Sequence, residues 1–146
     1  MPTVYADSSA LFALFHPRDA LHAAVEQWQR RHSADFLSNA VLRFELRHNL
    51  RLCRGDPDGE TAWRALEVAE RSAARLRLSD LDLERTFAQA ESLSRRFSQR
   101  SRRGAMGVFH VAAALDQEAA RFLTCDERQA AFARAAGLSV ELVAGG

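Results

Sequence analysis

The predicted fold of this chain rests on its first stretch, Thr3-Val4-Tyr5-Ala6-Asp7-Ser8-Ser9-Ala10-Leu11-Phe12-Ala13-Leu14-Phe15. A short apolar run ends in Asp7, and a helical pattern starts at once, which is typical of a buried strand that leads into a helix. A buried ionised carboxylate costs several kcal/mol unless a cation or a hydrogen-bond donor meets it. In open α/β sheets, ligands bind at the carboxyl ends of the strands. Asp7 is therefore a candidate binding residue.

The same arrangement returns near the other end of the chain. Arg121-Phe122-Leu123-Thr124-Cys125 runs into Asp126, and a second helical segment follows. Two strand-end acids that each open a helix indicate a shared acidic pocket, and such a pocket would hold a divalent cation. Asp is also a common N-cap, so a purely structural capping role for Asp7 and for Asp126 remains an alternative.

Length and composition restrict the class of protein. The chain has 146 residues, so residues 1–146 are expected to form one domain with a substantial core. No apolar stretch approaches the ~20 residues of a membrane span, no signal peptide is visible, and Cys53 and Cys125 lack the spacing of a zinc site. A cytoplasmic location is expected. The net charge of +1 excludes a globally basic nucleic-acid binder but not a local basic surface.

Periodicity predicts strands that alternate with helices. This order implies an α/β fold, with a mostly parallel twisted sheet of four to five short strands and helices on both faces. Residues 55–59 look like a turn cluster. Strands are expected at 3–6, 36–38, 74–78, 121–124 and 139–143, and helices at 8–15, 20–32, about 40–54, 60–72, 79 or 80 to about 98, 105–119 and 127–136.

Four segments together carry a resemblance to a known family. They are Val4-Tyr5-Ala6-Asp7-Ser8-Ser9-Ala10-Leu11, Val41-Leu42-Arg43-Phe44-Glu45-Leu46, Phe109-His110-Val111-Ala112-Ala113-Ala114-Leu115 and Phe122-Leu123-Thr124-Cys125-Asp126-Glu127-Arg128-Gln129. In content, order and approximate spacing, the chain resembles PIN domains, and more narrowly the VapC-type toxins of type II toxin–antitoxin systems. The resemblance implies the same α/β fold as the periodicity.

The resemblance also implies a function, that of a toxin which cleaves RNA hydrolytically with Mg²⁺ or Mn²⁺. Asp7, Glu45 and Asp126 match acids that gather around the metal in that family, and Ser8 and Thr124 match hydroxyl positions that could orient a carboxylate or a water. The implied partners are a small antitoxin, an RNA substrate and a second copy of the chain. For Glu45, an ion pair with an Arg one helical turn away is the alternative interpretation.

One acid of the family pattern is missing. An Asp is expected three residues before His110, and this sequence has Gly107 there; the basic residue common at the position of Gly104 is absent too. Catalysis is therefore expected to be impaired. The alternative is a catalytically inactive PIN-fold module that binds antitoxin or RNA without cleavage. His110 itself is given no catalytic role, and nothing in the sequence marks a DNA-directed nuclease of the flap type.

Arginines cluster ahead of this segment. A phosphate-binding rim for RNA is one interpretation, because the guanidinium fork suits phosphate, and a solvated helix end is the other. The cluster consists of Arg95, Arg96, Arg100, Arg102 and Arg103, of which Arg100, Arg102 and Arg103 are the candidate RNA-binding residues.

Overall fold

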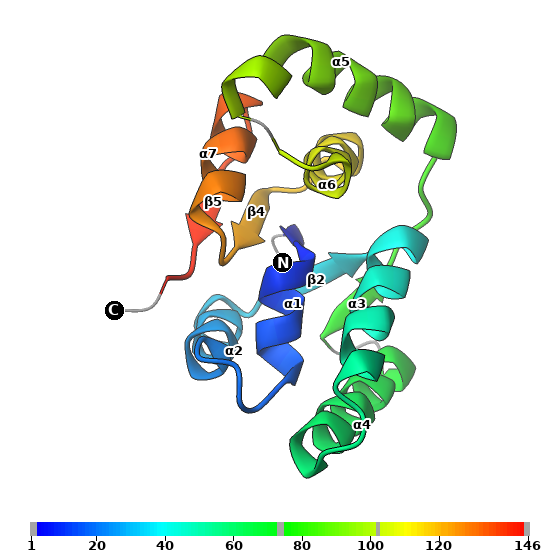
Figure 1. Cartoon of the computed structure of the whole chain (residues 1–146), viewed down its shortest axis with the longest axis vertical. Coiled ribbons are helices and arrows are strands. Elements are labelled where there is room, and N and C mark those ends of the chain that lie inside the picture. The colour runs from blue at the N-terminus through cyan, green and yellow to red at the C-terminus, as the bar shows by residue number, and fades with distance from the viewer. Residues whose placement is uncertain (1–2, 73–74, 102, 145–146) are drawn as a thin grey trace.

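The computed structural model describes residues 3–72, 75–101 and 103–144, without the side chains of residues 98, 100 and 101. Helices and strands alternate along most of this part of the chain (Figure 1). The elements are β1 (Thr3–Ala6), α1 (Ser8–Phe15), α2 (His22–His32), β2 (Asp35–Ser38), α3 (Ala40–Leu52), α4 (Pro57–Ser72), β3 (Leu76–Leu78), α5 (Leu83–Ser101), α6 (Ala105–Asp116), β4 (Arg121–Thr124), α7 (Glu127–Ala135) and β5 (Val140–Leu142).

The five strands of the described chain form one parallel sheet in the order β3-β2-β1-β4-β5. From β1 the chain builds outward through β2 to β3, and it then returns to the other side of β1 to add β4 and β5. The strand order therefore reverses between β1 and β4. In sheets of this kind, the crevice outside the carboxyl ends of the two strands at the reversal is the usual ligand site.

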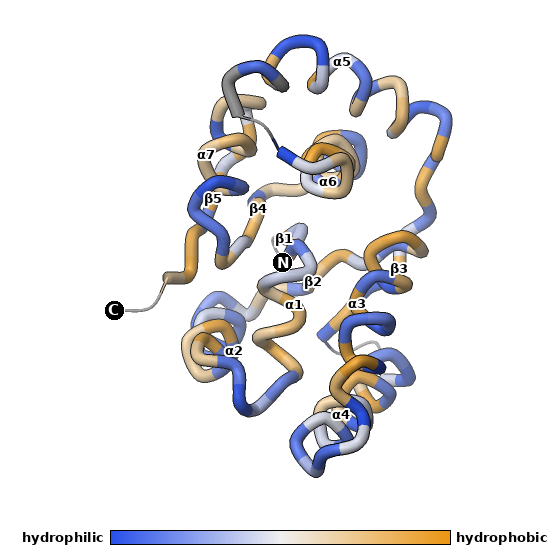
Figure 2. The backbone as a smooth tube through the Cα atoms, viewed as in Figure 1, coloured by the Kyte–Doolittle hydropathy of each residue, from blue (hydrophilic) through white to orange (hydrophobic). Residues whose placement is uncertain are grey.

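Helices cover both faces of the sheet. Figure 1 shows α5 and α6 on one side and α1 and α2 on the other. The α1 helix is largely apolar along its length, whereas α5 carries many polar residues (Figure 2), because α1 lies against the sheet and α5 lies outside α6. The fully parallel sheet and its covered faces confirm the predicted α/β fold.

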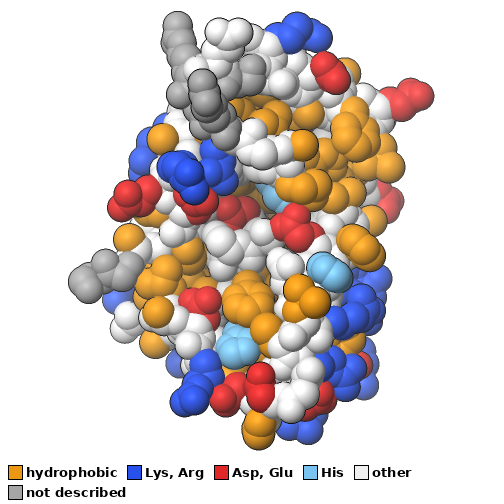
Figure 3. Space-filling model, in the orientation of Figure 1, with side chains coloured by type: hydrophobic (Ala, Val, Ile, Leu, Met, Phe, Trp, Pro, Cys, Tyr) orange, Lys and Arg blue, Asp and Glu red, His pale blue; other side chains and the backbone are white. Residues whose placement is uncertain are grey.

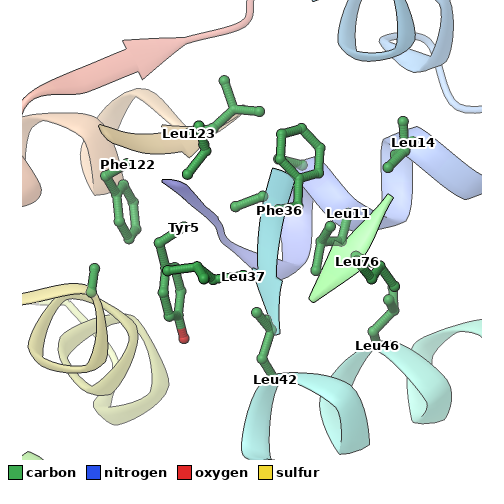
Figure 4. Close-up of a cluster of buried hydrophobic side chains, with 14 of the residues drawn as sticks. Tyr5, Leu11, Leu14, Phe36, Leu37, Leu42, Leu46, Leu76, Phe122 and Leu123 are labelled. Carbon is green, nitrogen blue, oxygen red and sulfur yellow. The ribbon is translucent and has the colours of Figure 1, made fainter. Parts of the chain in front are cut away.

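The core sits between the sheet and these helices. The Tyr5 ring stacks on Phe122 at 5.7 Å between ring centroids, and Figure 4 shows it between Phe122 and Leu37. Leu11 and Leu14 fill the core from α1. Each of these side chains is almost completely buried, and full burial of one large apolar side chain stabilises the fold by ~1.5–3 kcal/mol.

Most predicted elements are present with shifted ends. The predicted turn at 55–59 overlaps the start of α4, because Pro57 suits a first helical position and the Asp56 side chain accepts a hydrogen bond from the Gly59 amide at 2.7 Å. The α6 helix ends at Asp116 rather than 119, before Glu118 adopts a left-handed φ of 51°. The predicted strand 74–78 is shorter, and residue 74 lies outside the described residues.

None of the helices in the described segments combines the length and apolar character that crossing a bilayer requires.

Candidate active site

Asp7 lies between β1 and α1, and the residue is 5% exposed. Its Oδ1 accepts hydrogen bonds from the Ser9 hydroxyl at 2.6 Å and from the Ala10 amide at 3.1 Å, which caps α1. Its Oδ2 accepts a hydrogen bond from the Thr124 hydroxyl at 2.5 Å. Burial raises the pKa of Asp7 and outweighs these hydrogen bonds, which lower it. Without a cation, the ionised form is therefore disfavoured at this position.

Asp126 occupies the equivalent position between β4 and α7. Its Oδ1 accepts from the amides of Arg128 at 2.8 Å and Gln129 at 3.3 Å, so this oxygen caps α7. Its Oδ2 lies 3.3 Å from a guanidinium nitrogen of Arg103. Burial works to raise the pKa of Asp126, but the two amides and the charges of Arg103 and Arg128 outweigh it, so the pKa lies below its usual range.

Both acids therefore cap the start of a helix, which was the alternative interpretation of the sequence. In each of them Oδ1 satisfies the helix, and Oδ2 points to other partners. An N-terminal capping carboxylate still has lone pairs for a ligand on its second oxygen. The capping role and a role at a site thus use different atoms.

Two hydroxyl groups tie the strand ends together. Thr124 donates to the Asp7 carboxylate and accepts from the backbone amide of Asp126 at 3.1 Å, so one hydroxyl connects the Asp7 side chain to the backbone at Asp126. The Ser9 hydroxyl donates to Asp7 and accepts from the Cys125 amide at 3.1 Å. The predicted orienting position of Thr124 lies beside Asp7. Ser9 belongs to the same arrangement, and the sequence reasoning missed it.

Glu45 reaches the same region from α3 and meets a histidine. Its Oε2 lies 3.3 Å from Nε2 of His110 on α6. Burial works to raise the pKa of Glu45, but hydrogen bonds from His110 and Ser8 outweigh it, and the pKa is lowered. Ser8 therefore acts on the pKa of Glu45, whereas the hydroxyls bonded to Asp7 are those of Ser9 and Thr124. The alternative of an ion pair with a neighbouring arginine is wrong for Glu45, because Arg43 and Arg47 both pair with Glu70 on α4 instead.

His110 belongs to a buried series of hydrogen bonds. Its Nδ1 lies 2.7 Å from the Tyr5 hydroxyl, which in turn accepts from the Asn39 side-chain amide at 3.1 Å. Because the Glu45 carboxylate can only accept, Nε2 of His110 carries the hydrogen of this contact, and in the neutral imidazole Nδ1 then accepts from the Tyr5 hydroxyl. This series links β1, α3 and α6 behind the carboxylate of Glu45, although the sequence analysis gave His110 no role.

At Gly107 the position of the missing acid is filled from α7. The Gln129 side chain donates to the Gly107 carbonyl oxygen at 2.8 Å, and its Oε1 accepts from Nε of Arg103 at 2.9 Å. A Cβ added at Gly107 would lie 2.7 Å from that Oε1 and 3.4 Å from Nε of Arg103. Gly107 therefore leaves the space that Gln129 and Arg103 occupy.

The three arginine predictions have different outcomes. Arg103 lies at the site, with a side chain that is 17% exposed and paired with Asp126. Arg102 lies outside the described residues, and the side chain of Arg100 is not described either.

The cysteines are both free thiols, and burial together with the charge of Asp7 raises the pKa of Cys125 to about 12.

The donor chemistry at this edge suits a hard divalent cation, which takes carboxylate oxygens and retains waters. In the described segments, however, no group of three His, Cys, Asp or Glu side chains is arranged to hold a metal ion. The Thr124 hydroxyl contacts the Asp7 carboxylate and the Asp126 backbone amide, whereas Glu45 is bound by His110. Their roles as metal ligands therefore remain predictions, with Asp7 and Asp126 as the best-placed pair.

On the face shown in Figure 3, acidic side chains border a hollow near the middle. Basic side chains lie beside the acids on one side of it, and an apolar patch lies on the other. Apolar side chains that remain largely exposed in this protein include Phe44 on α3, Phe87 on α5 and Met106 on α6. The site thus combines charge with apolar surface, which is a typical property of a surface that binds another molecule.

The sequence matches the model of the PIN domain over residues 4–138. This match spans nearly the whole chain, from β1 to the end of α7. The chain belongs to the PIN domain family. Among curated proteins, no sequence matches this PIN domain.

Solved structures share the fold at low sequence identity. VapC20 of Mycobacterium tuberculosis, a toxin that cleaves the sarcin–ricin loop, has a TM-score of 0.68 and 17% identity, covering 92% of this PIN domain and 95% of that chain. VapBC2 of Rickettsia felis, bound to a DNA fragment of its promoter, has a TM-score of 0.68 and 12% identity over 96% and 98% of the chains. FitAcB of Neisseria gonorrhoeae has a TM-score of 0.60 and 18% identity over 94% and 95%.

Proposed function

We propose that this PIN domain is the toxin of a type II toxin–antitoxin system and a metal-dependent endoribonuclease. The observation that carries the proposal is that Asp7 and Asp126 follow the neighbouring strands β1 and β4, where the strand order reverses, with Thr124 bonded to the Asp7 carboxylate and the Asp126 backbone. Family membership and the toxins among the solved structures support the same activity.

In this proposal, Asp7 and Asp126 would be the direct ligands of Mg²⁺ or Mn²⁺, and Glu45 would help through a water or a second ion. When bound, such an ion lowers the pKa of a water and offsets charge on the phosphoryl oxygens. The protein supplies positioning. Thr124 and Ser9 fix the carboxylate of Asp7, and His110 holds the carboxylate of Glu45.

The proposed partners are an antitoxin, RNA and a second copy of the chain, in the cytoplasm. Two of the similar solved structures are VapBC2 and FitAcB, and the VapBC2 structure includes promoter DNA. Exposed Phe44, Phe87 and Met106 offer apolar surface for protein contacts. Arg103 offers a cation for phosphate, because its guanidinium has further N–H donors beyond the two that bind Gln129 and Asp126.

Gly107 and Arg103 favour weakened catalysis. One expected acid is absent, and a guanidinium stands against Asp126. The same observations favour the second candidate function, a module that binds antitoxin or RNA and does not cleave.

RNA cleavage decides between the two functions. Fluorescently labelled RNA of mixed sequence is incubated with the protein and Mn²⁺ or Mg²⁺, with EDTA, or with the Asp126→Asn variant. The proposed nuclease cleaves slowly with metal, and cleavage stops with EDTA and in Asp126→Asn. Asp80→Asn is the matched control, because Asp80 is an exposed acid outside the site. Absence of cleavage at every metal concentration would favour the non-catalytic module, and cleavage that persists in EDTA would contradict the proposal.

A further inference from the structure

Arg103, Gln129 and Gly107 form a connected arrangement beside the proposed metal site. The chain of contacts runs from the Gly107 carbonyl to the Gln129 amide, from Gln129 Oε1 to Nε of Arg103, and from Nη2 of Arg103 to Oδ2 of Asp126. Both the oxygen and the nitrogen of the Gln129 side-chain amide are hydrogen-bonded, and the residue is only 2% exposed. It therefore holds the guanidinium in a fixed position.

The guanidinium lies at the oxygen that a metal ion would need. Oδ1 of Asp126 already accepts two backbone amides at the start of α7, and Oδ2 is the oxygen free of the cap. Arg103 lies 3.3 Å from this Oδ2. A divalent ion that approaches Oδ2 meets the positive charge of the guanidinium and has to displace it. Like charges a few ångströms apart repel strongly when they are partly shielded from water.

Gly107 is the reason that this arrangement fits. Any side chain at position 107 would bring a Cβ within 2.7 Å of Gln129 Oε1, so Gln129 would have to move. The glycine at position 107 and the position of Arg103 beside Asp126 are then linked, because Gln129 and Arg103 occupy the space that a side chain at 107 would need.

We infer that Arg103 is an internal cation that competes with a divalent ion for Asp126, held in place by Gln129 in the space that Gly107 leaves. The inference rests on the proposed metal site. Arg103 is thus an autoinhibitory contact within the chain. Its removal increases metal affinity, although most substitutions at a binding site decrease it.

Metal binding without RNA tests this inference. Mn²⁺ is titrated by calorimetry into the metal-free protein and into Arg103→Gln, with circular dichroism to verify that each variant is folded. We expect Arg103→Gln to bind Mn²⁺ about tenfold more tightly, because a full charge beside Asp126 is removed. Arg128→Gln is the matched control. It removes the same charge two residues from Asp126, where the Arg128 side chain is exposed and forms no ion pair found in the described structure with that acid.

Gly107→Ala provides a second, independent variant. It retains Arg103 but pushes on Gln129, so the guanidinium loses its anchor and Mn²⁺ affinity is expected to increase about threefold. Equal affinity of Arg103→Gln and the parent, at a site that Asp7→Asn abolishes, would overturn the inference and leave the proposed metal site intact. An equal increase in Arg128→Gln would also overturn it, since net charge would then be the cause. Binding that is absent throughout, or that Asp7→Asn leaves unchanged, would overturn the metal site and the inference with it.

Discussion

At the residue scale, Asp7 combines a structural cost with the proposed chemistry. The carboxylate is buried and has hydroxyl and amide donors but no cation within hydrogen-bond distance among the described residues. Burial raises its pKa. In the folded protein Asp7 therefore binds its proton more tightly than in the unfolded chain. Stability of the metal-free protein then falls as the pH rises from the ordinary carboxyl pKa through the raised one.

Asp7→Asn is expected to stabilise the metal-free protein at pH 7. Asn is as good an N-cap as Asp, so α1 keeps its cap while the buried charge is lost. We expect an increase of about 1 kcal/mol in the free energy of unfolding, or about 4 °C in Tm for a chain of this size. Thermal unfolding in EDTA measures it, with the exposed Asp80→Asn as control. A lower Tm for Asp7→Asn would show that the ionised carboxylate is well stabilised without metal.

Restoring the missing acid requires two substitutions. An Asp at position 107 meets Gln129 Oε1, so Gly107→Asp is combined with Gln129→Ala to clear the space. We expect the double variant to cleave RNA about 10²-fold faster than the parent, the scale of one preorganised contact to a transition state. Single-turnover cleavage with Mn²⁺ measures this, and Gln129→Ala alone is the control. Equal rates for the double variant and Gln129→Ala would mean that position 107 does not reach the site.

The sequence predicted the site residues that stand next to element boundaries. Thr124 was located through the resemblance, whereas Asp7 and Asp126 follow short apolar runs, so both could be located from the pattern alone. Gln129 and His110 could not. Each is a helix residue whose importance comes from a partner far away in the sequence, Arg103 for the first and Glu45 for the second.

At the scale of elements, the buried chain from Asn39 through Tyr5 to His110 joins α3, β1 and α6 behind Glu45. Tyr5→Phe removes the central hydroxyl and leaves Nδ1 of His110 without its hydrogen-bond donor. An unsatisfied buried polar group costs about 1–3 kcal/mol. Urea denaturation is expected to show a loss of this size in Tyr5→Phe.

A double-mutant cycle separates this contact from general packing. The cycle combines Tyr5→Phe with His110→Leu, and the two residues are in direct contact. Contacting residues show interaction energies of 0.5–3 kcal/mol, so we expect the two losses to be non-additive by about 1 kcal/mol. Additive losses would mean that the Tyr5 hydroxyl and His110 do not act together.

Element ends were less predictable than elements. The periodicity located the strands because a buried parallel strand is a short apolar run. The starts of α4 and α5 depend on single side-chain caps. Asp56 bonds to the Gly59 amide and Asp82 to the Arg85 amide, and in sequence both lie in polar stretches where several residues could cap equally well.

At the scale of the whole molecule, the position of the site follows from the strand order. The sequence shows that strands and helices alternate, and parallel pairing follows from that. It does not show that β4 pairs with β1 rather than with β3, because pairing depends on which apolar faces meet. Only this order brings Asp7 and Asp126 to neighbouring strands. The resemblance to PIN domains implied that these acids gather around the metal.

The central claim is that acids at this edge of the sheet form one cation site. A crystal of the Arg103→Gln variant soaked in Mn²⁺, with diffraction measured at the manganese absorption edge, tests it most directly. The account predicts one anomalous peak about 2.1 Å from carboxylate oxygens of Asp7 and Asp126, with Glu45 reaching it through water. Well-ordered carboxylates with no peak between them at saturating Mn²⁺ would contradict the account.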